Sequence, residues 1–269
     1  MIQVVIIGAA GRMGQALLRC IARSERVRLA GAVELSGCPA LGRDAGVVAG
    51  LPELGVALEA DVRAVAARAD VLVDFGGHAG VPGNVAAAAA AKKAFVLGTT
   101  GLADAEKHAV RQAAAVIPVV WSPNMSVGVN LLFSMVRQAA GVLGAEYDVE
   151  IVETHHRFKK DAPSGTALRL GEKVAEGRGQ DFRAVTVFGR QGETGERRRG
   201  EIGIHALRGG DVVGDHTVTF AVDGERVEFT HKASSRESFA MGALRAAEWA
   251  AGRAAGLYDM QDVLGIRQD

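Results

Sequence analysis

The sequence predicts an α/β protein in which a parallel-sheet domain is followed by an α+β domain with a mixed or antiparallel sheet. Up to about residue 125, short apolar runs alternate with longer helix-like stretches, as successive βα units do. Beyond Tyr147, apolar and polar residues alternate within each predicted strand, which favours antiparallel pairing with one face exposed. The 269 residues are enough for two domains of moderate size.

The composition favours a folded enzyme. Hydrophobic residues make up 48% of the chain, aromatic residues 5%, and 35 residues are glycine, as in Ala/Val/Leu/Gly-rich α/β proteins. Lys+Arg and Asp+Glu both total 31, so we expect neither nucleic acid nor a membrane as a partner. Cys20 and Cys38 show no paired spacing, which favours a reducing cytoplasm. The short N-terminal apolar segment lacks a basic region and no run of 18 apolar residues occurs, so we expect a soluble, unexported protein.

The first domain is expected over residues 1–127. Its predicted strands are Gln3–Ile7, Leu29–Val33, Val71–Phe75, Ala94–Leu97 and Val119–Trp121. Helices are expected between them, including the alanine-rich Val85–Lys92, which has high helix propensity, and Asp104–Ala115.

The second domain is expected over residues 128–237. Four segments alternate as strands do: AVTVFGR, EIGIHALR, HTVTFAVD and ERVEFTHKA. Asp223-Gly224 joins the last two, and this dipeptide is a strong signal for a two-residue hairpin turn. The stretch SFAMGALRAAEWAAG then predicts a helix, and we expect the C-terminal helix 238–269 to complete the first domain.

The segment VVIIGAAGRMGQAL predicts a strand, a glycine turn and a helix, the Rossmann-like context in which glycines bind a dinucleotide. Gly8 allows the tight turn, Gly11 lets the backbone approach a pyrophosphate, and Gly14 lets the helix and strand pack closely. The more usual G-x-G-x-x-G pattern would need glycine at Ala10 and Met13. Amides at the helix N-terminus, next to Arg12 and Met13, would face the phosphates. A glycine turn without a ligand is the alternative.

Glu34 lies 20 positions after Gly14, at the end of the second predicted strand. A carboxylate there accepts hydrogen bonds from ribose hydroxyls. A 2′-phosphate would meet this carboxylate and find Leu35 next to it, so NADH is expected to be preferred over NADPH. Arg12 and Arg43 either soften that preference or are solvated surface charges.

Two loops follow predicted strands at the edge where open α/β sheets bind ligands. The loop GTTGL places Gly98, Thr99 and Thr100 there, and Phe75 in DFGGHAG can pack near a ring. The alternative for the threonines is a simple turn, and His78 is expected to be a surface histidine.

The segment HHRFKKDAPSGTAL predicts an anion site. A turn ends at a helix start, so the amides of Ser164, Gly165 and Thr166 would point at a carboxylate or phosphate, and Lys159 adds positive charge. His155 and His156 face opposite sides of an extended segment, so one can donate a proton while the other binds the substrate. Zinc is disfavoured because the cysteines lie far away, and a solvated basic face is the other alternative.

Several motifs together resemble one family. GAAGRMG, GTTG, PNMSVGVNL, ETHHRFKKDAPSGTAL, LRGGDVVGDHTV and THKASSRESFA occur in one order over nearly the whole chain. This set resembles the 4-hydroxy-tetrahydrodipicolinate (dihydrodipicolinate) reductases of the bacterial diaminopimelate and lysine pathway. The resemblance implies a dinucleotide-binding domain closed by the C-terminal helix, a second domain whose sheet builds a homotetramer, and NADH or NADPH as cofactor.

The resemblance also implies residue roles. His155 would be the general acid that protonates the substrate, and Lys159 would assist it. The dicarboxylate would be bound by His156, Ser164, Gly165 and Thr166, with Thr100 close to substrate and nicotinamide. Hydride would pass from C4 of the nicotinamide to C4 of the ring.

The chain departs from the family pattern at a few positions. Phe158 replaces a histidine, Lys160 replaces an apolar residue, and Gly76 stands where a threonine is usual. Arg236 is either near the active site or in an interdomain ion pair. A dinucleotide-binding redox sensor, or another reductase of the same two-domain plan such as an amino-acid dehydrogenase, is the alternative function.

Overall fold

The computed structural model describes residues 1–266. It divides into two compact units, residues 1–127 together with the chain from Arg236 onward, and residues 128–235. The second boundary therefore lies two residues before the expected one.

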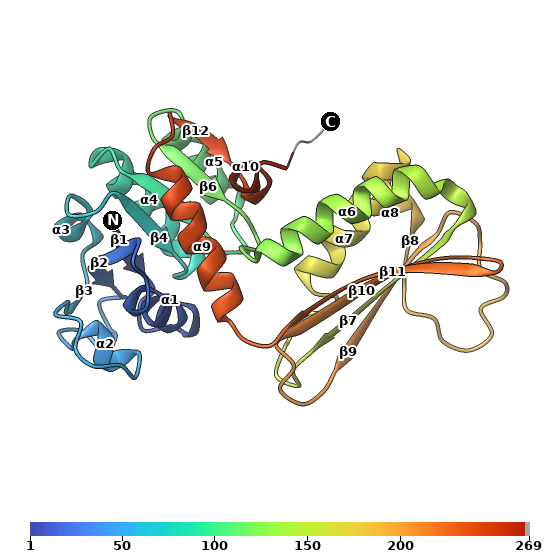
Figure 1. The fold of residues 1–269 in the computed structure, drawn as a ribbon, viewed down its shortest axis with the longest axis horizontal. Helices are drawn as coiled ribbons and strands as arrows, with labels where there is room; N and C mark the ends of the chain where they lie inside the picture. Colours follow the sequence, from blue (N-terminus) through green and yellow to red (C-terminus); the bar gives the residue numbers. More distant parts are fainter. Residues whose placement is uncertain (267–269) are drawn as a thin grey trace. The chain divides into compact units, whose positions relative to one another are not determined.

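The first unit contains a seven-stranded sheet in the order β12-β6-β5-β4-β1-β2-β3 (Figure 1). Every neighbouring pair in it is parallel. The strands are β1 (Ile2–Ile7), β2 (Val27–Val33), β3 (Leu58–Glu59), β4 (Val71–Asp74), β5 (Ala94–Leu97), β6 (Pro118–Trp121) and β12 (Gly256–Tyr258). The five predicted strands are confirmed, while β3 and β12 were missed because two or three residues are too few to show a period.

Helices cover both faces of this sheet, because its strands are apolar on both sides. Along β1, Val4 and Ile6 belong to one core and Val5 and Ile7 to the other. The first core is closed by α1 (Arg12–Ala22), α9 (Glu237–Ala250) and α10 (Met260–Leu264). The second is closed by α3 (Val62–Ala66), α4 (Val81–Ala90) and α5 (Asp104–Ala114). The short elements α2 (Ala45–Val48) and η1 (His78–Gly80) lie in the connections.

Two helix predictions need correction. The alanine-rich helix spans Val81–Ala90 rather than Val85–Lys92, because Pro82 is favourable in the first helical turn. The expected C-terminal helix over 238–269 is instead α9, β12 and α10. It is interrupted where Gly252 and Gly256 lower helix propensity, and the Asp259 carboxylate then caps α10 through the Gln261 amide at 2.7 Å. Residues 267–269 lie outside the described part.

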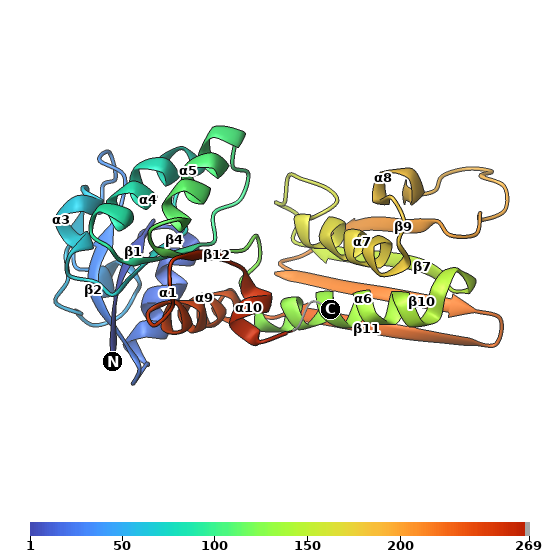
Figure 2. The same ribbon diagram turned by 90° about the horizontal axis from the view of Figure 1, so that it is seen from above.

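The second unit contains a five-stranded mixed sheet in the order β11-β10-β7-β9-β8 (Figure 2). Its strands are β7 (Asp148–His155), β8 (Thr186–Phe188), β9 (Ile202–Arg208), β10 (Gly214–Val222) and β11 (Glu225–Ala233). The β10–β11 hairpin turns at Asp223-Gly224 as predicted, and β7 pairs antiparallel with β10. The expectation of antiparallel pairing was wrong for β8 and β9, since β7–β9 and β8–β9 are parallel. The long connection between β8 and β9, residues 189–201, permits this.

One face of this sheet packs on α6 (Val127–Leu143) and α7 (Gly165–Arg178), with Phe133, Leu170 and Phe220 in the shared core. Gly177 lets the two helices approach, since a Cβ there would lie 2.2 Å from the Arg137 carbonyl oxygen. η2 (Gly144–Glu146) and α8 (Phe182–Val185) complete the unit. By length and composition alone, the helical stretch Val127–Glu146 would suffice to cross a membrane, a test that core helices also pass.

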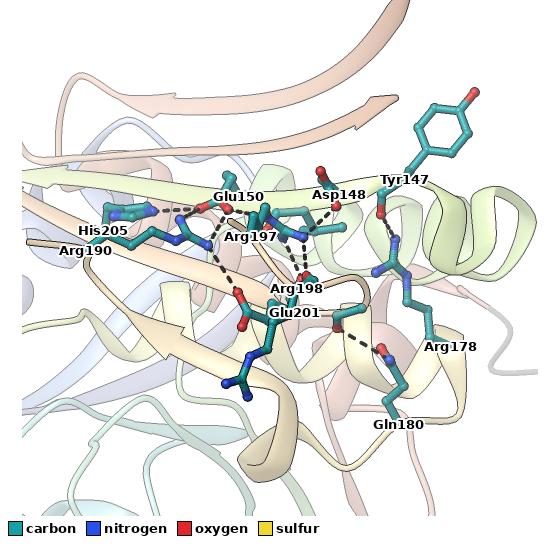
Figure 3. A network of polar contacts seen from close by, with 12 residues as sticks. Tyr147, Asp148, Glu150, Arg178, Gln180, Arg190, Arg197, Arg198, Glu201 and His205 are labelled. Carbon is teal, nitrogen blue, oxygen red and sulfur yellow. Dashed lines mark hydrogen bonds and ion pairs between the residues drawn. The ribbon is translucent and has the colours of Figure 1, made fainter. Parts of the chain in front are cut away.

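The opposite face of the sheet carries an ion-pair network that ties down the 189–201 connection (Figure 3). Glu150 on β7 accepts hydrogen bonds from Arg190 at 3.0 Å, Arg197 at 2.9 Å and His205 at 2.7 Å. Burial opposes ionisation, but these donors together lower the pKa of Glu150 to about 2. Gly203 makes room, because a Cβ there would lie 1.8 Å from the Glu150 carboxylate.

Candidate functional sites

The glycine turn between β1 and α1 is shaped by two close approaches. Gly8 has φ +79°, and a Cβ on it would lie 2.9 Å from the Gly76 backbone. A Cβ on Gly14 would lie 2.2 Å from the Gly8 carbonyl oxygen. Gly11 is the N-cap residue of α1. Gly14 is therefore needed for packing the helix against the turn, and Gly8 for the turn itself.

The turn uses its own amides internally. The Gly8 and Ala9 amides donate to the Val33 carbonyl at 2.9 and 3.1 Å, the Ala10 amide to Glu34 at 3.0 Å, and the Gly11 amide to Gly8 at 3.1 Å. The amides left at this end of α1 belong to its first turn, which starts at Arg12 and Met13. The exposed Arg12 and half-buried Met13 thus lie where helix N-terminal amides would meet an anion.

Glu34 directly follows β2 and lies beside a cavity of about 770 Å³, whose lining includes Gly8, Glu34, Leu35 and Arg63. Its carboxylate accepts from the Ala10 amide and from the Leu35 amide, each at 3.0 Å. Each oxygen keeps a lone pair for a further donor, such as a ribose hydroxyl. Leu35 is 70% exposed and brings no cation to this position.

The loops after β4 and β5 interlock. A Cβ on Gly98 would lie 2.3 Å from the Phe75 ring, so glycine is what allows this aromatic ring to lie on the loop backbone. Thr99 is buried and turns its hydroxyl toward Asp74, at 3.4 Å, whereas Thr100 is exposed. Of the two threonines, only Thr100 is open to a ligand.

Asp74, which the sequence analysis did not single out as functional, organises this edge. It is fully buried and accepts from the Gly76 amide and from Asn84, each at 2.8 Å. Burial raises the pKa of Asp74, against these hydrogen bonds. Gly76, which stands where the family usually has a threonine, therefore helps to hold the loop through its backbone amide.

Two further polar residues of the sequence analysis, His78 and Arg236, lie in the first unit. His78 contacts Glu106 at 2.9 Å on the surface, in line with its expected role. Arg236 is the N-cap residue of α9, and burial, with the nearby charge of Arg12, lowers its pKa.

In the second unit, strand β7 ends at His155. Glu153 and His155 point to the same face, because side chains repeat every two residues on a strand. His155 Nδ1 lies 2.6 Å from Glu153 Oε2, while the ring of His156 lies near that of Phe158 at 6.3 Å. The two histidines therefore have separate surroundings, and Phe158 contacts the second one only.

Helix α7 starts after the N-cap residue Ser164, whose hydroxyl accepts from the Ala167 amide at 3.2 Å. The expectation that the Ser164 amide faces a ligand was wrong, because that amide donates to Glu153 at 2.9 Å. Gly165 and Thr166 form the first turn, and its dipole favours an anion. The site thus offers the helix N-terminus and the Ser164 side chain.

A buried histidine orients the Ser164 hydroxyl. His216 Nε2 lies 3.0 Å from Ser164 Oγ, and burial lowers the pKa of His216 to about 3, which keeps the ring neutral. In the described part of the chain, the buried Nδ1 of His216 has no hydrogen-bond partner. An orphan acceptor is less costly than an orphan N–H group, so the proton belongs on Nε2. Ser164 Oγ then accepts twice, and its own proton is left for a ligand.

Lys159 follows in the loop after β7. Its Nζ bonds both oxygens of the exposed Asp161 at 2.9 and 2.8 Å. This pair gives the cation a counter-ion that an anionic ligand can replace.

Three residues that lie close to His155 or Ser164 were missed by sequence reasoning, namely Glu153, Arg208 and His216. Register places them together, since His155 lies opposite Arg208 on β9 and Glu153 opposite His216 on β10. The period of two from His155 back to Glu153 was the one available signal. Within residues 1–266, no group of three His, Cys, Asp or Glu residues is placed to hold a metal ion.

The fold and the glycine turn define a class, the oxidoreductases in which a Rossmann-like dinucleotide-binding domain is joined to a mixed-sheet domain. Family models described as the N-terminus and the C-terminus of dihydrodipicolinate reductase match residues 2–125 and 128–264. The chain belongs to the dihydrodipicolinate reductase family.

Individual relatives agree with this assignment. The chain is 53% identical over 267 residues to the 4-hydroxy-tetrahydrodipicolinate reductase of Anaeromyxobacter dehalogenans (strain 2CP-C), covering 99% of each chain. It is 50% identical over 264 residues to that of Cupriavidus necator, covering 98% of this chain and 99% of the relative. A solved structure, the dipicolinate-bound dihydrodipicolinate reductase from Paenisporosarcina sp. TG-14, matches 99% of this chain and 100% of its own with TM-score 0.77 and 23% identity, which supports the fold.

Proposed function

We propose that the protein reduces 4-hydroxy-tetrahydrodipicolinate to tetrahydrodipicolinate with NADH or NADPH, in diaminopimelate and lysine biosynthesis. The observation that carries this is the cluster in the second unit, where a protonatable histidine backed by a carboxylate, a lysine and a helix N-terminus occur together. These groups suit a small dicarboxylate. The activity named for the relatives at 50–53% identity supports the same substrate.

The residues of the first unit fit a dinucleotide. The close approaches at Gly8 and Gly14 leave no room for a Cβ, and the first turn of α1 supplies amides for a pyrophosphate. When bound, the nicotinamide supplies a hydride from its C4 to C4 of the substrate ring. Phe75, Gly98, Thr99 and Thr100 shape the loops for the nicotinamide half. The Thr99 hydroxyl bonds Asp74, so Thr99 holds the loop rather than contacting the cofactor.

Within the second unit, His155 is the general acid and protonates the ring carbon next to C4, after the hydroxyl has left as water. Lys159 leaves Asp161 and contacts the substrate. His156, the Ser164 hydroxyl and the amides of Gly165 and Thr166 bind the carboxylates. This positive environment stabilises the negative charge that builds up in the ring as hydride arrives.

NADH is the proposed preferred cofactor. Glu34 accepts from ribose hydroxyls, whereas a 2′-phosphate would be repelled by its carboxylate. Leu35 provides no positive charge that would offset this repulsion.

The expected cytoplasmic location stays a prediction.

A homotetramer built through the sheet of the second unit is also proposed. Within the described residues, α6 and α7 pack on one face of that sheet, and the other face bears polar side chains such as Thr217 and Thr230, whose hydroxyls are 3.0 Å apart. Light scattering during size-exclusion chromatography tests the mass, and a monomer would contradict the proposal.

The reaction is tested by mixing the enzyme and NADH, and separately NADPH, with substrate freshly made from pyruvate and aspartate semialdehyde. Rapid dinucleotide oxidation that depends on the condensed product, with higher kcat/KM for NADH, is expected. Dinucleotide oxidation that requires a keto acid and ammonia instead of the condensed product would point to an amino-acid dehydrogenase. Dinucleotide binding without turnover would point to a sensor.

A further inference from the structure

Glu153 is a carboxylate in an unusual place. It is fully buried at the end of β7, where an ionised carboxyl group is strongly destabilised unless it is paired. Four hydrogen bonds compensate it: Arg208 donates from Nη1 at 2.8 Å and Nη2 at 3.0 Å, the Ser164 amide at 2.9 Å, and His155 at 2.6 Å. Burial alone would raise the pKa of Glu153, but these bonds lower it.

We propose that Glu153, kept ionised by Arg208, is a positioning residue that holds the proton of neutral His155 on Nδ1 and so aims Nε2 at the substrate. This inference rests on the proposed function, in which His155 is the general acid. An ionised carboxylate has no proton to donate, so the nitrogen facing it must carry one. In the described residues, Nε2 of His155 has no hydrogen-bond partner and is therefore the nitrogen that gives and takes the proton.

Glu153 also stabilises the protonated ring of His155 against the rest of its surroundings. Burial lowers the pKa of His155, and the charges of Lys159 and Arg208 add to this effect. The hydrogen bond and charge of Glu153 oppose it. The titratable and charged groups around His155 are Glu153 on β7, Arg208 on β9, His216 on β10 and Lys159 in the loop after β7. Beyond them, Asp161 pairs with Lys159, and His231 on β11 lies next to His216. Glu153 is the one among them that directly bonds the imidazole ring.

The structure offers a matched control on the same strand. Glu150 is also paired with arginines and with a histidine, His205, but it lies on the opposite face of the sheet (Figure 3). Glu150→Gln removes a similar network without touching His155. A purely structural effect of losing a β7 carboxylate would therefore be seen in both variants.

The first experiment compares Glu153→Gln with Glu150→Gln in kcat/KM for the substrate as a function of pH. Glu153→Gln is expected to lower kcat/KM by at least about 10-fold, and by no more than the ~10²–10⁴-fold that general acid catalysis contributes, with dinucleotide affinity unchanged. Because the imidazolium loses its counter-charge, the pKa of His155 falls. As the pH is raised, the variant should therefore lose activity at a lower pH than the wild type does. Glu150→Gln should keep the wild-type pH profile. Identical profiles for wild type and Glu153→Gln would overturn the proposal.

The second experiment reads the tautomer in the wild-type enzyme and uses a variant only to assign the signal. Wild-type enzyme with ¹⁵N-labelled histidine, with His155→Gln as the assignment control, reports the tautomer of His155 by long-range ¹H–¹⁵N correlation. The Nδ1–H tautomer is expected, and the Nε2–H tautomer would refute the inference. This result does not depend on turnover, so failure of the inference and failure of the proposed reaction are distinguishable.

Discussion

Replacement of Arg208 by methionine is the most informative test of stability in the second unit. The guanidinium donates two hydrogen bonds, at 2.8 and 3.0 Å, to the fully buried Glu153. Hydrogen bonds to a charged group contribute about 1.5–3 kcal/mol each, so two give about 3–6 kcal/mol. Breaking a buried ion pair by removing one partner costs about 3–5 kcal/mol, which agrees. We therefore expect Arg208→Met to lower the free energy of unfolding by roughly 3–5 kcal/mol near neutral pH.

The loss should depend on pH with a definite sign. In the wild type the folded-state pKa of Glu153 is depressed, so its stabilisation is present above the unfolded pKa and is lost as pH falls through the folded pKa. In Arg208→Met, loss of the guanidinium should raise the folded-state pKa of Glu153, because burial is then less compensated. Because unfolded-state titration is common to both proteins, the difference between variant and wild type should grow as pH rises from the depressed folded pKa of the wild type, below about 4.5, to the folded pKa of the variant, and shrink on acidification.

Native-state hydrogen exchange of the β7 and β10 amides measures this free energy within the second unit. Arg190→Met is the matched control, because Glu150 keeps Arg197 and His205 and is partly exposed. That control should lose no more than about 1 kcal/mol. A penalty for Arg208→Met below about 1 kcal/mol, or one that does not change with pH, would refute the reasoning.

The other predictions concern the ligand sites. Gly98→Ala places a methyl group 2.3 Å from the Phe75 ring and should raise KM for the dinucleotide about 10-fold or more. The control Gly252→Ala, with open space around it, should leave KM unchanged. Steady-state kinetics measure both, and equal KM values for the two variants would contradict the packing argument. Glu34→Gln removes the charge that repels a 2′-phosphate, so the NADPH to NADH ratio of kcat/KM should rise about 10-fold, and an unchanged ratio would reject Glu34 as the discriminating group. Lys159→Ala should lower kcat/KM for the substrate about 100-fold or more, or several kcal/mol of transition-state stabilisation, and unchanged turnover would exclude its catalytic role.

The first unit was largely predictable because its signals are local. Apolar runs separated by helix-like stretches located β1, β2, β4, β5 and β6, and the glycine spacing located the turn. Segments of two or three residues such as β3 and β12 carry no period, so only pairing with neighbouring strands defines them.

The second unit was less predictable because its order depends on distant pairings. Nothing local in β8 and β9 distinguishes parallel from antiparallel partners. The same holds for the site, since Glu153 meets Arg208 across 55 positions of sequence. Local reasoning found the turn at Ser164 but assigned its amide to a ligand. The amide instead donates to the buried carboxylate of Glu153, which lies 11 positions earlier on β7.

The transfer of isotope label tests the central claim most directly. NADH carrying deuterium in the transferred position at C4 would be incubated with the enzyme and freshly condensed substrate, and the product analysed by mass spectrometry and NMR. The account predicts tetrahydrodipicolinate with deuterium at ring C4. Oxidised dinucleotide without label in this product, or label in a different compound, would contradict the proposed reaction.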